Sequence, residues 1–127
     1  MDKNIRILVA NRPKLMRELI LETLADQPGI EVVGEVSDDA EIAGRVAQTR
    51  PDLLVIALDE PARRPQICDA VLREHPELRI IAVSSNQNRS IGYWASFAIH
   101  SDDIEPSEVG ILNAVRTMTG GTGGETR

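Results

Sequence analysis

Ser84 and His100 are the two side chains of this sequence that could act together as a nucleophile and a base. Each stands at the end of a short apolar run, but no acidic residue has an obvious place from which to orient the histidine. Cys68 is the single cysteine, so an internal disulfide is excluded, and no Cys/His spacing fits a zinc site. We therefore expect no enzymatic activity, no bound metal and no cofactor.

The composition is that of one acidic domain. The chain has 127 residues, with 14 Lys and Arg against 20 Asp and Glu, which gives a formal charge of −6 and a pI near 4.9. This length suits a single domain, and an acidic chain lacks the clustered cations that direct nucleic-acid binding requires. No cleavage pattern follows the N-terminus and no apolar run reaches membrane-spanning length, so we expect a cytoplasmic protein with no membrane partner.

Short apolar runs alternate with amphipathic segments along the chain. The runs are rich in β-branched residues and too short for helices, which predicts strands, whereas apolar residues at helical spacing predict helices that face a core. The predicted strands are residues 5–10, 30–36, 53–58, 79–84 and a short fifth at 97–100, and the predicted helices are about 15–24, 38–47, 65–75 and 106–118. A flexible Gly-rich tail at 119–127 follows this domain of residues 1–118, and it is a poor phosphate loop because it follows a helix.

This alternation predicts an α/β fold, namely a flavodoxin-like, doubly wound, five-stranded parallel sheet of order 2-1-3-4-5 with helices on both faces. In such sheets the functional crevice lies at the carboxyl ends of the strands, where strands 1 and 3 meet. That rule selects Asn11 and Arg12 after the first strand and Ala57 in the third. Ser84 and His100, at the ends of the fourth and fifth strands, are expected to flank them.

Several stretches resemble the receiver domain of bacterial response regulators, especially those joined to DNA-binding output domains. They are Ile-Arg-Ile-Leu-Val-Ala (5–10), Leu-Met-Arg-Glu-Leu (15–19), Ile-Glu-Val-Val-Gly-Glu (30–35), Arg-Pro-Asp-Leu-Leu-Val-Ile (50–56) and Ile-Ile-Ala-Val-Ser-Ser (80–85). The resemblance covers residues 4 to 118. It implies two acids after strand 1 that hold Mg²⁺ and a phosphoacceptor aspartate at the end of strand 3. It also implies a Thr or Ser after strand 4 and a Lys after strand 5.

The sequence departs from that pattern at most of the chemical positions. The acidic pair aligns with Asn11 and Arg12, the phosphoacceptor with Ala57 and the lysine with His100, so Ser84 alone keeps the expected type. Mg²⁺ needs anionic oxygen, and phosphoryl transfer needs a carboxylate nucleophile. These substitutions predict a degenerate pseudo-receiver that cannot be phosphorylated.

Arg12 has two interpretations at this stage. Its cation occupies the vacant crevice and pairs with Asp59, Glu60 or Asp102, or it points into solvent. An exposed pair of this kind contributes about 1 kcal/mol. Asp59 itself is expected to be a solvated turn carboxylate and not a substitute phosphoacceptor.

All three aromatic residues, Tyr93, Trp94 and Phe97, fall within five positions. The segment that carries them is short by about one and a half helical turns, so the fourth helix is expected to be shortened or replaced by a loop around residues 86–90. Clustered Trp and Tyr are typical of interfaces. The cluster is therefore either a partner face or a cap on the shortened core.

These features predict an atypical receiver-like protein that works in signal transduction by protein–protein interaction without phosphorylation. Its partner would be another signalling protein or a second copy of the chain. An alternative is the receiver half of a longer DNA-binding regulator. A flavin or cobalamin binder on the same fold is disfavoured, because the loop at residues 11–14 is bulky and contains neither a Ser/Thr/Gly-rich stretch nor a histidine.

Overall fold

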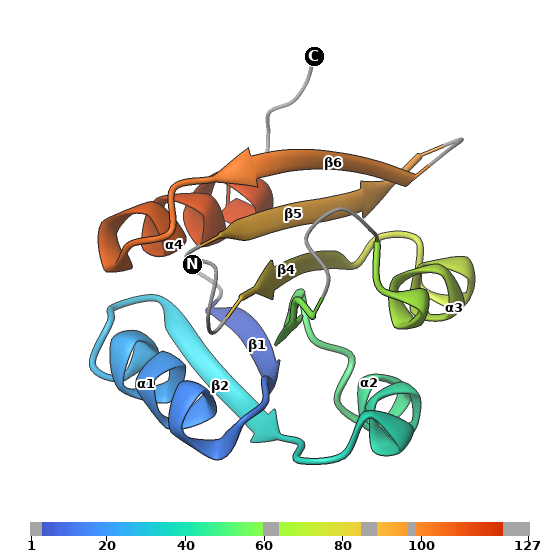
Figure 1. Cartoon of the computed structure of the whole chain (residues 1–127), viewed down its shortest axis with the longest axis horizontal. Coiled ribbons are helices and arrows are strands. Elements are labelled where there is room, and N and C mark those ends of the chain that lie inside the picture. Colours follow the sequence, from blue (N-terminus) through green and yellow to red (C-terminus); the bar gives the residue numbers. More distant parts are fainter. Residues whose placement is uncertain (1–3, 60–63, 85–88, 97–98, 121–127) are drawn as a thin grey trace.

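The computed structural model describes residues 4–59, 64–84, 89–96 and 99–120 (Figure 1). Its elements are, in order, β1 (Ile5–Ala10), α1 (Lys14–Leu24), β2 (Ile30–Glu35), η1 (Asp39–Glu41), α2 (Ile42–Thr49), β3 (Leu53–Ala57), α3 (Gln66–Glu74), β4 (Arg79–Val83), β5 (Ser90–Ala95), β6 (Ile99–Ile104), α4 (Glu108–Val115) and the π-helical turn η2 (Arg116–Gly120). The predicted tail therefore begins within η2, and residues 121–127 lie outside the described part.

The strands form one mixed sheet of order β2-β1-β3-β4-β5-β6. β1 to β4 are parallel neighbours, which confirms the predicted arrangement of the first four strands. β5 and β6 are antiparallel to their neighbours, so the predicted five-stranded, all-parallel order is wrong. The chain makes a hairpin where the prediction placed a helical crossover and a single final strand.

The hairpin follows from the residues of β5. Ile91 and Tyr93 alternate with Gly92, and their β-branched and aromatic side chains favour an extended, half-buried strand. Ile91 and Tyr93 are buried, with 6% and 4% of their surface exposed, in the cluster that also contains α3. A strand therefore occupies residues 90–95, where the prediction allowed a shortened fourth helix, and residues 85–88 lie outside the described part.

Helices cover both faces of the sheet, as predicted. Figure 1 shows α1 and α4 together on one side and α2 and α3 on the other. The core beneath them is almost entirely aliphatic, with both clusters running through β3: Leu54 and Ile56 pack towards α2 and α3, and Leu53 and Val55 pack towards α1 and α4. β3 is buried on both faces, which explains its uninterrupted apolar sequence.

Candidate functional site

The carboxyl ends of β1 and β3 are joined by the side chain of Asn11. Its Nδ2 donates a hydrogen bond to the carbonyl oxygen of Ile56 at 2.9 Å, and the residue is fully buried. Its Oδ1 is also buried and has no hydrogen-bond partner among the described residues. Asn11 therefore acts as a strand-to-strand brace one residue before Ala57, and its amide offers no negative charge to a cation.

Arg12 lies beside this brace and makes ion pairs with two loops. Its Nε and Nη2 donate to the two carboxylate oxygens of Asp39 at 3.1 Å each, and Nη2 also donates to Asp59 Oδ2 at 3.0 Å. The hydrogen bond to Asp59 and the charges of both carboxylates raise the Arg12 pKa above its ordinary value, although partial burial opposes this. The cation thus holds the β2–α2 and β3–α3 connections together at the end of β1.

The expected partners of Arg12 are confirmed in part. Asp59 is one partner, as predicted, whereas Asp39 was not among the candidates. Asp102 belongs to β6 at the far edge of the sheet, and Glu60 lies outside the described residues. Asp39 was missed because only the fold brings the start of the second helical segment, η1, beside the end of β1.

Ala57 ends β3 in the wall of a cavity of about 640 Å³ beside these ion pairs. Its methyl group is 7% exposed and brings no polar atom to the cavity. Across the cavity, Arg64 Nε donates to Asp69 Oδ1 at 2.7 Å, which lowers the Asp69 pKa and raises that of Arg64. Arg12 and Arg64, the two arginines among the described residues that line the cavity, are therefore already paired with carboxylates.

The donor set at this edge does not fit a divalent cation. Among the described residues, Asp39 and Asp59 are the carboxylates that line the cavity with Ala57, and both accept hydrogen bonds from the Arg12 guanidinium. A hard cation such as Mg²⁺ would have to displace that fixed positive charge before reaching either oxygen. Within the described residues, no group of three or more His, Cys, Asp or Glu side chains is arranged to hold a metal ion.

Ser84 and His100 do not meet. Ser84 follows β4 and lines a different cavity, between α1 and α4. His100 lies near the start of β6, where it pairs with Trp94 at the end of the sheet opposite to Ala57. Because His100 stands near the start of the last strand, Ile99–Ile104, and not at its end as predicted, the expectation that His100 flanks the crevice is wrong.

The three aromatic residues do not form one face. Tyr93 is buried among the residues beneath α3, and this burial raises its pKa. Trp94, as its neighbour in the strand, points to the opposite face and stacks on His100 with ring centroids 5.2 Å apart. Phe97 lies outside the described residues. Tyr93 thus serves the core, which is the second of the two interpretations that the sequence left open.

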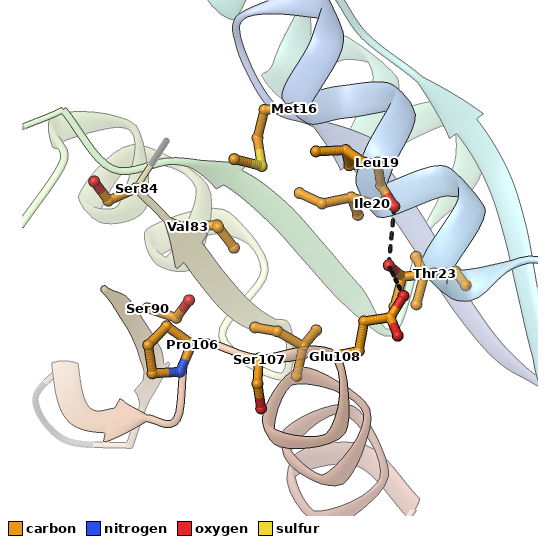
Figure 2. Close-up of a pocket in the computed structure, with 12 residues that line it drawn as sticks. Met16, Leu19, Ile20, Thr23, Val83, Ser84, Ser90, Pro106, Ser107 and Glu108 are labelled. Atoms are coloured by element: carbon orange, nitrogen blue, oxygen red, sulfur yellow. Dashed lines mark hydrogen bonds between the residues drawn. The ribbon is translucent and has the colours of Figure 1, made fainter. Parts of the chain in front are cut away.

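A second cavity, of about 430 Å³, separates α1 from α4 (Figure 2). Its wall is mostly apolar, with Met16, Leu19 and Ile20 contributed by α1. Thr23 bridges its edge by donating to Leu19 O at 2.9 Å and contacting Glu108 Oε2 at 3.3 Å. The sequence did not predict this cavity, because its position depends on that of α4. The helix follows β6, which lies one strand further from the centre of the sheet than the predicted last strand.

No protein-family model matches the chain. The curated relatives include the response regulator GacA of Pseudomonas viridiflava, 30% identical over 81 residues that make up 63% of this chain and 38% of GacA. They also include a protein-glutamate methylesterase/protein-glutamine glutaminase of Geobacillus kaustophilus, 29% identical over 84 residues, 65% of this chain and 24% of that protein. The chain therefore spans between a quarter and two fifths of the length of these relatives.

Solved structures with the same fold include the signal receiver domain of the response regulator NarL from Mycobacterium tuberculosis. Its TM-score is 0.58 at 23% identity, covering 67% of this chain and 69% of that one. The response regulator domain of Thermotoga maritima CheB gives a TM-score of 0.55 at 25% identity, covering 65% of this chain and 62% of that one. Together, the sequence and structure comparisons support a response-regulator receiver domain.

Proposed function

We propose that this chain is a receiver domain that transmits signals through protein–protein contacts without aspartyl phosphorylation. The observation that carries the proposal is the Arg12 guanidinium, which bridges Asp39 and Asp59 beside the methyl group of Ala57. A receiver that phosphorylates itself uses a carboxylate nucleophile and a divalent cation at this edge. Here a methyl group aligns with the nucleophile position, and the cation of Arg12 is paired with both neighbouring carboxylates.

The fixed cation has a consequence for regulation. A phosphorylated site changes state when metal and phosphoryl groups arrive and leave, whereas a guanidinium is always protonated at physiological pH. The loops that carry Asp39 and Asp59 are therefore held in one arrangement. The state of such a domain is set by its binding partner or by its abundance.

A magnesium titration of the full chain, followed by NMR at the backbone amides of residues 11, 12, 39 and 59, tests this proposal. We expect no saturable shift at millimolar concentrations of Mg²⁺. The positive control is the triple variant Asn11→Asp/Arg12→Asp/Ala57→Asp, which removes the fixed cation and supplies three carboxylates. Saturable Mg²⁺ binding by the unaltered chain at these amides would overturn the proposal, and binding by the variant alone would support it.

The comparisons also favour a second arrangement, in which this domain is one part of a longer regulator. GacA is among the relatives, and the structural neighbours include a LuxR-family response regulator from Aurantimonas and RcsB from Salmonella enterica bound to a promoter. In that case an attached output domain would bind DNA and this acidic domain would control it. The reading frame downstream of Arg127 in the source genome distinguishes the two arrangements.

A further inference from the structure

Among the described residues, β6 is the outermost strand on its side of the sheet and pairs only with β5. Its four central residues, His100, Ser101, Asp102 and Asp103, are all exposed. Figure 1 shows β6 running along the edge of the sheet. An exposed edge strand presents backbone donors and acceptors that can pair with a strand from another chain.

Symmetry restricts how a second copy can pair with β6. Two identical edge strands can pair antiparallel about a two-fold axis perpendicular to the sheet. In that arrangement, the corresponding faces of the two sheets lie on the same side of the joined sheet. Because successive side chains point to opposite faces, residues that lie opposite each other must have the same parity. One residue must therefore lie opposite its own copy, with the axis between the two copies, and two residues adjacent in sequence cannot lie opposite each other across the axis.

The charges of β6 select one of the possible axes. An axis at Asp102 or at Asp103 would place two copies of that carboxylate opposite each other, which is destabilising. An axis at His100 would place two imidazoles opposite each other. An axis at Ser101 places His100 of each copy opposite Asp102 of the other and sets the two serines side by side.

We propose that β6 pairs antiparallel with β6 of a second copy about Ser101, and that this joins the two six-stranded sheets into one. The proposal goes beyond the proposed function, because it names the partner of one surface, and it does not depend on the phosphorylation state. Two reciprocal contacts between His100 and Asp102 give the interface its register.

The surroundings of these residues support that register. The His100 ring is oriented by its stack on Trp94 and by a 2.7 Å contact between its Nε2 and Ser96 Oγ, and its Nδ1 has no hydrogen-bond partner among the described residues. On the opposite face, Asp103 is already held by Arg89 at 3.2 Å. Asp102 has no ion-pair partner among the described residues, so its charge is the one that a second copy would compensate.

Charge-swap variants of the full chain test the interface by sedimentation velocity over a range of micromolar concentrations. We expect a concentration-dependent dimer for the unaltered chain. His100→Asp places two carboxylates opposite each other and Asp102→His places two imidazoles opposite each other, so each variant loses the His–Asp contacts and should weaken the dimer by about tenfold. The double variant His100→Asp/Asp102→His exchanges the two side chains and should restore the dimer. A chain that stays monomeric throughout, or a double variant no better than the singles, would overturn the proposal.

Disulfide trapping tests the axis itself. At the two-fold axis the two Ser101 residues lie opposite each other, with Cβ atoms about 4.5–5.5 Å apart, so Ser101→Cys should form an intermolecular disulfide under mild oxidation. The matched control is Asp103→Cys, whose two copies would lie four residues apart along the strands and should not cross-link. The native Cys68 is fully buried and does not interfere. Faster cross-linking of the Asp103→Cys chain would contradict this register and leave the phosphorylation proposal untouched.

Discussion

Arg12 Nη2 lies 3.0 Å from Asp59 Oδ2, so a side chain that follows β1 is paired with one that follows β3. The same guanidinium holds Asp39 from η1. Three connections that are distant in sequence therefore meet at one positive charge beside Ala57. This cluster gives the edge of the sheet a fixed electrostatic state, and its contribution to stability can be measured.

Arg12→Ala should lower the free energy of unfolding by about 1 kcal/mol, because the exposed pairs with Asp39 and Asp59 are both lost. That corresponds to a decrease in melting temperature of about 3–5 °C for a domain of this size. Thermal unfolding followed by circular dichroism measures the change. The effect should shrink at high salt, because ion pairs at the surface are screened.

The matched control for this prediction is Arg64→Ala. The Arg64 and Arg12 side chains are equally exposed, at 40% and 38%, and both pair with carboxylates, but Asp69 is only five residues from Arg64. Losing this local pair should therefore cost less than losing the bridge between distant loops. A larger loss for Arg64→Ala would contradict the role assigned to Arg12.

Replacing either of two glycines on opposite sides of the sheet by alanine should change the stability of the chain in opposite directions. A Cβ at Gly44, inside α2, would meet no atom within 4 Å, so Gly44→Ala should stabilise the chain by about 0.5–1 kcal/mol. A Cβ at Gly110 would collide with the backbone carbonyl of Glu105, at the start of α4. Gly110→Ala should therefore destabilise the chain by about 1–3 kcal/mol. Chemical denaturation of both variants checks the two signs together.

The Asp69 carboxylate predicts an acid-dependent contribution to stability. The hydrogen bond from Arg64 lowers the Asp69 pKa below its ordinary value of 3.8 in the folded chain. Folding therefore favours the ionised form, so the stabilisation is complete above the ordinary pKa and is lost as the pH falls through the folded value. The difference in stability between the unaltered chain and Asp69→Asn should shrink over that acidic range. A difference that stays constant to low pH would show that the pair does not act through this charge.

Cys68 should be unreactive in the folded chain. Burial raises the pKa of its thiol to about 12, so almost none of it is thiolate near neutral pH. Alkylation of Cys68 at about pH 8 should occur only when the structure opens. In a denaturant, the rate of alkylation should therefore increase and follow the rate of unfolding. Rapid modification under native conditions, read by intact mass, would show that α3 does not cover this residue as described.

The first four strands and the pocket residues at their ends could be predicted because each strand is short and rich in β-branched or other aliphatic residues. Leu53–Ala57 is buried on both faces, and its sequence carries no competing pattern. Asn11 and Ala57 then follow from counting to the ends of β1 and β3. The pairing of Arg12 with Asp59 was one of two readings, and the structure selects it.

The hairpin of β5 and β6 could not be predicted from the same signals. Ile91 and Tyr93 have the alternation of a strand, but the segment was expected to carry a helix because the preceding strands are each followed by one. The predicted last strand ended at His100, whereas β6 begins at Ile99, so His100 lies at the end of the sheet opposite to the pocket. The bounds of one strand, which depend on long-range pairing, therefore decided where a candidate site residue lies.

Intact mass spectrometry after incubation of the full chain with acetyl phosphate and Mg²⁺ tests whether this domain can be phosphorylated. Trp94 emission would be a poor substitute, because Trp94 lies at the end of the sheet remote from Ala57. We expect that no phosphoryl group is added to the chain. A stoichiometric, Mg²⁺-dependent increase in mass by one phosphoryl group, located at Asp59 or another carboxylate of this edge, would contradict it.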